Sequence, residues 1–382
     1  MTTSDDLSVL RSKPFSDAVE KFEDLLVQDG RAFLIGAGCS KCAGLPLTAE
    51  LTTQALASAE LDDTSKAILT AVKDQFDGSM NAQIEDYLSE LIDLLAIAER
   101  RVERGASQQK ITLDTTGYTS EQLLGAANQI KRAIGCVIEK KVTLDTHRAF
   151  VAAIHRPVRV GKISPGHVVD YLVLNYDTAI EDALALERVS YADGIDGGPT
   201  GWWNPNTFDR DGLGARVLKL HGSINWCEFP DDPLPRRIAA SIEVEATTNR
   251  RILIWPASTK YRETQLDPYA QLADRARHVL QPPKGSQRVL VICGYSFGDA
   301  HINTELDRAL HESAGDLTVV AFTSEDRPHG QLKAWTEDEK VRDQVLVFAN
   351  RGFFHGDTSE ESEQYLLWWK FENITRLLGG ER

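Results

Sequence analysis

The stretch FLIGAGCSKCAGLP, from Phe33 to Pro46, decides the fold. Its apolar start predicts a short buried strand. Gly36 and Gly38, in the turn that follows, would let the backbone come close to a phosphate, although a tight strand-to-helix corner without a ligand fits the same pattern. A second helix is predicted after the proline, with Thr48 as its N-cap.

This turn does not complete the dinucleotide-binding fingerprint G-x-G-x-x-G. Lys41 stands where the third glycine belongs, and Gly44 comes three residues late. No acidic residue ends a second strand about 20 residues further on, because that region has a helical pattern. These departures argue against a hydride-transferring enzyme. A phosphate site made of backbone N–H groups at a helix N-terminus stays open.

Cys39 and Cys42 in the same turn have C-x-x-C spacing. A structural zinc site needs four ligands and usually two such pairs, but the chain has no second pair, so no zinc is expected. A redox pair would need thioredoxin-like surroundings, which are missing. Packing of small residues is therefore favoured. Five cysteines spread along the chain fit reduced thiols in a cytoplasmic protein better than a disulfide framework.

The composition is that of an ordinary globular protein: 382 residues, 42% of them hydrophobic and 26% charged. The net charge of −15 disfavours direct nucleic-acid binding by this chain. The first residues do not resemble a secretory signal, and no stretch approaches the roughly 18 apolar residues of a membrane span. We therefore expect a cytoplasmic location and no contact with a membrane.

After the first turn, the sequence has a helical pattern, and further along it alternates between short apolar runs and helices. Residues 45–140 contain no convincing strand, and helical spacing is strongest around Ile84 to Leu95. After residue 168, short apolar runs alternate with helices. The predicted strands are RAFLIGAG, VVDYLVLNYD, RVLKLHGSINW, RRILIWPAS, RVLVICGYSFGD, LTVVAFTS and QVLVFAN.

This pattern predicts an α/β fold: a Rossmann-like open, mostly parallel sheet with a helical insertion after the first strand-turn-helix unit. We expect one domain over residues 1–382, with the insertion at about 48–140. Residues Asp193 to Ala215 are rich in Gly, Pro, Asn and Trp and predict a long loop at about 190–216. A loop of this length is often a binding loop or lid.

Four of the predicted strands end in polar clusters: GAGCS, NYD, HGSINW and GYSFGDAHIN. The carboxyl ends of parallel strands line the ligand crevice of an open sheet, so these clusters are expected to meet there. Taken singly, each has a structural explanation. Asn175 and Asp177 could cap a helix, and His221 could be a packed histidine. Asp299 and His301 could suggest a metal, but no further ligands have recognisable spacing, and the role of Asn303 stays open.

Taken together, the clusters resemble the sirtuin family in its bacterial, defence-associated branch. That family lines an NAD pocket with a G-A-G-x-S loop, an N-x-D, an H-G and a late G-x-S. The matching residues are Gly36, Ala37, Gly38, Ser40, Asn175, Asp177, His221, Gly222, Gly294 and Ser296. The segment NAQIEDYLSELI also resembles an Ile-Glu-Asp helix often seen in this branch. The resemblance runs from about residue 30 to 355, without the long loops.

The sequence departs from the protein deacylases of the family. Their proline-acid-phenylalanine-arginine segment is missing from GLPLTAEL, Leu174 replaces a glutamine, and the four-cysteine zinc module is absent. The acyl-lysine channel is therefore not expected.

What remains implies hydrolysis of NAD to nicotinamide and ADP-ribose, in anti-phage defence by NAD depletion. In this resemblance Asn175 orients the ribose and a water, Asp177 contacts the nicotinamide end, and His221 is the base. The loop with Gly36, Ala37, Gly38 and Ser40 holds phosphates. Gly294 and Ser296 hold the adenosine ribose.

The resemblance also implies partners: a homo-oligomer and a hexameric HerA-type ATPase. The chain has no G-x-x-x-x-G-K-[ST] pattern of its own, so ATP chemistry would need that second protein. The alternatives are a divergent deacylase or ADP-ribosyltransferase, and a non-catalytic NAD or ADP-ribose sensor.

Overall fold

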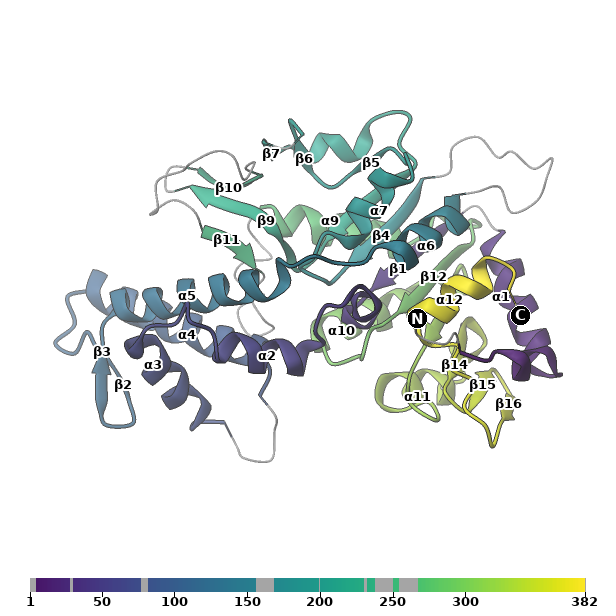
Figure 1. Ribbon diagram of the computed structural model, residues 1–382, viewed down its shortest axis with the longest axis horizontal. Helices are drawn as coiled ribbons and strands as arrows, with labels where there is room; N and C mark the ends of the chain where they lie inside the picture. The colour runs from purple at the N-terminus through teal and green to yellow at the C-terminus, as the bar shows by residue number, and fades with distance from the viewer. Residues whose placement is uncertain are drawn as a thin grey trace.

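The computed structural model describes residues 5–27, 30–76, 82–155, 168–198, 200–229, 232–237, 250–253 and 267–381. Its centre is a nine-stranded sheet in the order β16-β15-β14-β13-β12-β1-β4-β8-β5 (Figure 1). The strands are β1 (Arg31–Ile35), β4 (Val169–Val173), β5 (Tyr191–Ala192), β8 (Ala215–Lys219), β12 (Arg288–Cys293), β13 (Leu317–Phe322), β14 (Val345–Ala349), β15 (Gly352–His355) and β16 (Thr358–Glu361). All pairings are parallel except those of β15 and β16 at one edge. The predicted open, mostly parallel sheet is confirmed.

The parallel strands follow a Rossmann order. From β1 the chain moves outward through β4 to β8, then returns to β12 on the other side of β1 and continues to β13 and β14. The strand order therefore reverses between β1 and β12. In an open α/β sheet, ligands bind at the carboxyl ends of the strands at this reversal.

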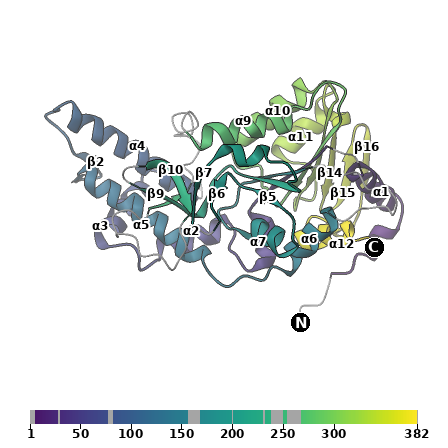
Figure 2. The ribbon, with the colours of Figure 1, turned by 90° about the horizontal axis from the view of Figure 1, so that it is seen from above.

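Helices cover both faces of the sheet, so its strands are apolar on both sides. Along β1, Phe33 and Ile35 join the core under one helix layer, while Ala32 and Leu34 join the core under the other. The first layer comprises α1 (Phe15–Leu26), α6 (Asp145–His155), α7 (Ala179–Leu186) and α12 (Phe371–Leu378). The second comprises α9 (Tyr269–Leu280), α10 (Ala300–Glu312) and α11 (Gly330–Glu337). Figure 2 shows the two layers on opposite sides of the strands.

The segment after the first turn forms a helical cluster beyond one end of the sheet (Figure 1). Its helices are α2 (Thr48–Leu56), α3 (Asp63–Lys73), α4 (Ile84–Glu103) and α5 (Ser120–Ile138). They enclose an apolar core of their own, which also takes in Tyr176 from the loop after β4 and Ile224 from β9. The domain limits predicted from the sequence stay a proposal.

The expectation that residues 45–140 contain no strand is wrong in one place. A hairpin of β2 (Ile111–Leu113) and β3 (Thr116–Tyr118) links α4 to α5. Three-residue strands are too short for a period-2 pattern to stand out, so the sequence does not signal them.

A second, five-stranded sheet has the order β11-β9-β10-β7-β6. Its strands are β6 (Ile195–Asp196), β7 (Gly201–Trp203), β9 (Gly222–Phe229), β10 (Asp232–Arg237) and β11 (Arg250–Leu253). RVLKLHGSINW, predicted as one strand, is thus two strands in different sheets. RRIL of the predicted strand RRILIWPAS pairs antiparallel with β9, outside the main sheet, and the rest of that stretch lies outside the described residues.

The predicted loop at 190–216 is largely ordered into short elements. It contains β5, β6, β7, a 3₁₀ helix η3 (Pro205–Asp209) and the start of β8. Trp203 is 5% exposed and stacks edge-on against Trp226 of β9. Gly194, Gly197 and Gly198 of this segment have positive φ angles in the tight turns beside β6, and Asn204 caps η3. None of the helices in the described ranges is long and apolar enough to span a bilayer.

Candidate functional site

The turns after β1 and β12 touch through their backbones at three glycines. Gly36 N–H donates to Cys293 O at 2.9 Å, and Gly38 N–H donates to Gly294 O at 2.9 Å. A Cβ at Gly36 would lie 2.5 Å from Gly294 O, and one at Gly38 would lie 2.7 Å from Gly294 Cα. Gly294 has φ +63°, a conformation that favours glycine. These glycines are therefore required by the contact between the two turns, whatever they bind.

The turn after β1 is not followed directly by an α-helix. Residues Ala37–Ala43 form a 3₁₀ helix, η2, which ends at Gly44 with φ +89°. The next helix, α2, begins at Thr48, and its N-cap is Leu47 rather than Thr48. Its capping contact comes from Glu50, whose carboxylate accepts from Leu47 N–H at 3.1 Å. The expected helix N-terminus at the glycine turn is therefore a short 3₁₀ helix.

The backbone donors of this turn are partly used within the protein. Besides Gly36 and Gly38, Cys39 N–H donates to Gly36 O at 3.0 Å. The N–H groups of Gly36, Gly38 and Cys39 are thus occupied, and Ser40 lies within the 3₁₀ helix. The cradle has fewer donors for a phosphate than the sequence pattern suggests.

Asn175, Ser40 and Asp177 form one hydrogen-bonded chain. Asn175 Nδ2 donates to Gly36 O at 3.0 Å and to Ser40 Oγ at 2.8 Å. Ser40 Oγ in turn donates to Asp177 Oδ2 at 2.7 Å, and Asp177 Oδ1 accepts from Ala179 N–H at 3.0 Å. Asn175 and Ser40 are only 7% and 3% exposed. Asn175 Oδ1 is buried and has no hydrogen-bond partner among the described residues.

His221 follows β8 and lies between two carboxylates. Its Nε2 is 3.2 Å from Asp299 Oδ2 without hydrogen-bonding alignment, and its Nδ1 is 4.0 Å from Glu85 Oε1. The side chains of His221 and Asp299 are both 7% exposed. Glu85 belongs to the first turn of α4, in the helical cluster.

The loops that carry Asn175 and His221 run side by side. Leu220 N–H donates to Val173 O at 3.0 Å, and Ile224 N–H donates to Tyr176 O at 2.9 Å. Tyr176 is buried, and its hydroxyl lies 3.5 Å from Glu85 Oε1. The predicted meeting of the four polar clusters at one edge of the sheet is therefore confirmed by direct contacts.

Residues after β12 have different roles within this edge. Asp299 caps α10 by accepting from His301 N–H at 2.9 Å. Asn303 holds the preceding turn, because its Nδ2 donates to Phe297 O at 2.7 Å and its Oδ1 accepts from Tyr295 Oη at 2.9 Å. Ser296 is exposed. Within the described ranges, no group of three or more His, Cys, Asp and Glu side chains could hold a metal ion.

The C-x-x-C cysteines are not poised for redox chemistry. Cys39 is fully buried beside Cys293, and burial raises its pKa well above the usual value. Burial also raises the pKa of Cys42 to about 12. Reactive cysteines have lowered pKa values, so these thiols fit the packing role expected from the sequence.

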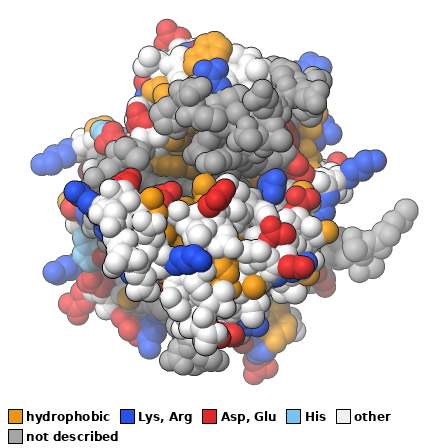
Figure 3. All heavy atoms as spheres, turned by 90° about the vertical axis from the view of Figure 1, so that its left-hand side faces the viewer, with side chains coloured by type: hydrophobic (Ala, Val, Ile, Leu, Met, Phe, Trp, Pro, Cys, Tyr) orange, Lys and Arg blue, Asp and Glu red, His pale blue; other side chains and the backbone are white. Residues whose placement is uncertain are grey.

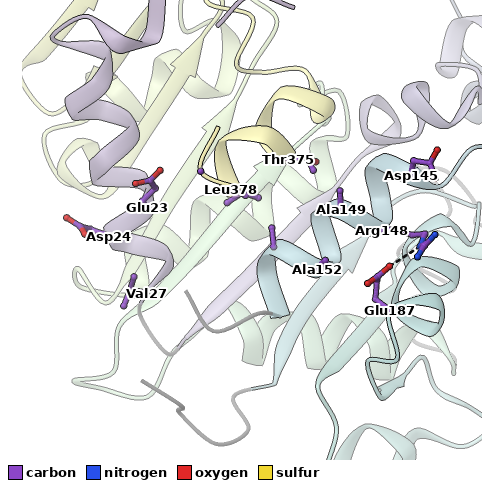
Figure 4. Close-up of a pocket in the computed structure, with 13 residues that line it drawn as sticks. Glu23, Asp24, Val27, Asp145, Arg148, Ala149, Ala152, Glu187, Thr375 and Leu378 are labelled. Atoms are coloured by element: carbon purple, nitrogen blue, oxygen red, sulfur yellow. Dashed lines mark hydrogen bonds and ion pairs between the residues drawn. The ribbon is translucent and has the colours of Figure 1, made fainter. Parts of the chain in front are cut away.

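A cavity of about 790 Å³ lies elsewhere, between α1, α6 and the end of α12 (Figure 4). Its rim carries Glu23, Asp24 and Asp145, and Arg148 is paired with Glu187 at 2.9 Å. None of the polar cluster residues at the sheet edge lines it. At the end of the molecule formed by the helical cluster, acidic and basic side chains are interspersed (Figure 3). Neither this cavity nor this charged surface suggests a ligand related to the polar clusters at the sheet edge.

The sequence alone did not assign two of the side chains found here. Glu85 was signalled only by the resemblance of NAQIEDYLSELI to a family helix, without a role. Lys219 is part of a predicted apolar strand, and no local pattern indicates a role for it, yet it is fully buried next to Asp177.

Part of this edge of the sheet falls within a match to a known family model. Residues 170–343 match the family model described as a SIR2-like domain. That match includes Asn175, Asp177, His221, Gly294 and Ser296, and it leaves out the first glycine turn. A search of curated proteins finds no match.

Two solved structures of Sir2 homologues, both in complex with ADP-ribose, are also similar to this chain. One is a histidine-to-asparagine variant with 11% identity over 94% of this chain and 95% of its own. The other is a phenylalanine-to-alanine variant with 10% identity over 94% and 96%. The TM-score is 0.43 in both cases. Similarity at this level does not establish a shared activity.

The glycine contact yields a stability prediction. Gly36→Ala should lower the free energy of unfolding by about 1–3 kcal/mol or more, because the new methyl group meets backbone atoms that cannot move aside. The control is Gly125→Ala within α5, where a Cβ meets nothing within 4 Å. That change should instead add about 0.5–1 kcal/mol. Urea unfolding of both variants is the measurement, and equal stability of the two would contradict the packing argument.

A second stability prediction concerns Ser40. Ser40→Ala removes the hydroxyl that joins Asn175 to Asp177 and should cost about 1–3 kcal/mol, because the buried Asn175 Nδ2 loses an acceptor and the partly buried Asp177 carboxylate loses a donor. Ser286→Ala, which removes an exposed hydroxyl bonded to Pro283 O, should stay within about 0.5 kcal/mol of the wild type. Urea unfolding midpoints compare the two. A Ser40→Ala protein as stable as the control would mean that the hydroxyl bridge contributes nothing.

Proposed function

We propose that this chain binds NAD at the carboxyl edge of its main sheet and hydrolyses the bond between nicotinamide and ribose. The observation that carries the proposal is the chain of contacts Asn175–Ser40–Asp177 beside His221, at the reversal of strand order. Most of these residues fall within the SIR2-like match. The products would be nicotinamide and ADP-ribose.

We assign roles to the two glycine turns from the backbone and side-chain groups that each leaves available to a ligand. The pyrophosphate would lie at the turn after β1, where Ala37 contributes an N–H group not bonded to Cys293, Gly294 or Gly36. The adenosine ribose would lie against Gly294 and the exposed Ser296. This division puts the phosphates at backbone donors and away from the carboxylates around His221.

Asn175 is the proposed contact to the nicotinamide ribose. A buried carbonyl oxygen without a partner is costly and needs a ligand or a water. Asn175 Oδ1 is such a group among the described residues, and a ribose hydroxyl could donate to it. The side chain cannot turn away freely, because its Nδ2 is held by Gly36 O and Ser40 Oγ.

In the proposed reaction His221 acts as the general base. As the C–N bond breaks, its electron pair goes to the nicotinamide ring, and positive charge develops on the ribose, as in glycoside hydrolysis. Water attacks the anomeric carbon, and its proton passes to His221. Asp177 would lie at the nicotinamide end. Asp299 and Glu85, at 3.2 and 4.0 Å from the ring nitrogens, would stabilise the imidazolium that forms.

The wider proposal is anti-phage defence by NAD depletion, in the cytoplasm and without zinc as a structural element. A divergent deacylase or ADP-ribosyltransferase would use the same bond cleavage with another acceptor, and a non-catalytic sensor would bind NAD or ADP-ribose without turnover. The loss of the deacylase segments in GLPLTAEL and at Leu174 favours water as the acceptor.

The catalytic proposal predicts the behaviour of two variants. Asn175→Ala and His221→Ala should each lower NAD consumption by roughly 10²–10⁴-fold, through lost positioning and lost base catalysis. His278→Ala, at a histidine on α9 whose side chain is 78% exposed, is the control and should retain wild-type activity. Melting curves of the same preparations separate loss of chemistry from loss of fold.

Product analysis by mass spectrometry distinguishes the alternatives. Free ADP-ribose supports the hydrolase, acyl-ADP-ribose a deacylase, and modified protein a transferase. Binding of NAD without any product supports the sensor. A folded His221→Ala protein that hydrolyses NAD at the wild-type rate would refute the mechanism.

Assembly is the second part of the proposal. We expect a homo-oligomer that also binds a hexameric HerA-type ATPase, because a toxic hydrolase needs a control and the sequence has no P-loop pattern. Light scattering of the 42.4 kDa chain should show a mass above that of the monomer. A monomer with full NAD hydrolysis and no partner would contradict this expectation.

A further inference from the structure

Lys219 is a buried charge next to the site that the proposed mechanism does not use. It is the last residue of β8, two positions before His221, and it is fully buried. Its ammonium donates to the backbone carbonyl of Asp177 in a short contact. One side chain thus joins the strand that leads to His221 with the loop that carries Asn175 and Asp177.

The counter-charge of Lys219 comes from the helix that follows the same loop. Glu181 lies in the first turn of α7, and its Oε1 is 3.2 Å from Lys219 Nζ. Its other oxygen, Oε2, is buried and has no hydrogen-bond partner among the described residues. Burial raises the pKa of Glu181 to about 7, although the nearby ammonium opposes the shift.

We propose that Lys219 is a positioning residue that fixes the Asn175–Asp177 loop relative to His221, with Glu181 as its counter-charge. The proposal rests on the proposed NAD hydrolysis for its kinetic consequence. Its structural consequence, a loop held by the ammonium, does not depend on that activity.

Stability alone does not explain this pair. Burying two charges is costly, and a buried ion pair can often be replaced by apolar side chains of similar size without loss of stability. An apolar pair, however, cannot donate a hydrogen bond to Asp177 O. The Lys219 ammonium therefore holds the Asp177 carbonyl by a hydrogen bond, which a methionine cannot do.

Position matters at this point because the loop carries the proposed catalytic groups. Asp177 accepts a hydrogen bond from Ser40 Oγ, which itself accepts one from Asn175 Nδ2. A shift of the Asp177 backbone would pass along this chain to the amide that orients the ribose. Misplacement of reacting groups by about 1 Å can cost roughly 10²-fold in rate.

The test is a double variant, Lys219→Met with Glu181→Leu, in the full-length protein. The matched control is Arg277→Met with Glu305→Leu, a partly buried pair between α9 and α10 with an N–O distance of 3.0 Å. Both should fold. We expect the Lys219/Glu181 variant to lose about 10- to 10²-fold in kcat for NAD, with KM changed much less, and the control to keep wild-type kinetics.

Hydrogen exchange, followed by mass spectrometry on a peptide covering residues 174–182, supplies a readout that needs no activity. Exchange in this peptide should become roughly tenfold faster in the double variant, with global unfolding unchanged, because the loop opens locally. Unchanged exchange would overturn the proposal. So would faster exchange with wild-type kcat in an active enzyme. If the wild type does not turn over NAD, faster exchange supports the positioning role while the proposed hydrolysis fails.

Glu181→Gln separates the two members of the pair. It keeps the Lys219 contact with Asp177 O, so exchange and kcat should stay within about threefold of wild type, and a kcat as low as in the double variant would overturn the proposal. The folded-state pKa of Glu181 is raised, so its contribution to stability is complete below about pH 4.5 and is lost as pH rises through about 7. The melting temperature of wild type relative to Glu181→Gln should therefore fall across that range. Should the apolar double variant not fold, Lys219→Met with Glu181→Gln, which also removes the donor to Asp177 O, replaces it under the same criteria.

Discussion

The backbone contact between the turn after β1 and the turn after β12 is the constraint on which the rest of the site depends. Gly36 and Gly38 lie against Gly294 at distances that leave no room for a Cβ on any of them. The contact brings the two halves of the Rossmann sheet together at the reversal of strand order. It also uses the N–H groups of Gly36 and Gly38, so the glycines are explained by packing before any ligand is considered.

This contact positions the polar groups of the site one after another, through a series of hydrogen bonds. Gly36 O holds Asn175, Ser40 joins Asn175 to Asp177, and the Asp177 backbone is held by Lys219. The helical cluster takes part as well, because Tyr176 packs in its core and Glu85 lies 4.0 Å from His221. The site is therefore built jointly by the sheet and the helical cluster. A displacement of α4 would alter the surroundings of His221 directly.

The sequence predicted the architecture well where local pattern and topology agree. Apolar runs that end in polar residues located β1, β4, β8, β12, β13 and β14, and the rule for strand ends predicted that their clusters meet. It failed where the partner of a strand decides its place. RRIL has the texture of a buried strand, but its pairing with β9 is set by contacts far along the chain.

The composition of residues 190–216 gave the same kind of error, since short strands joined by tight turns have the residue content of a loop. Local sequence patterns could not indicate the roles of Lys219 and Glu85 for a related reason. Each acts through partners 42 or more positions away: Asp177 for Lys219, and Tyr176 and His221 for Glu85.

The distribution of charge at the sheet edge is consistent with the reaction proposed for it. NAD carries a negative pyrophosphate and a positive nicotinamide ring, and positive charge develops on the ribose during cleavage. Carboxylates close to the pyrophosphate would repel it. In this chain Glu85 and Asp299 lie beside His221. The turn after β1 has no acidic residue of its own from Gly36 to Gly44, although Asp177 accepts from its Ser40 hydroxyl. In the proposed reaction Glu85 and Asp299 would lie where positive charge moves from the nicotinamide ring to the ribose.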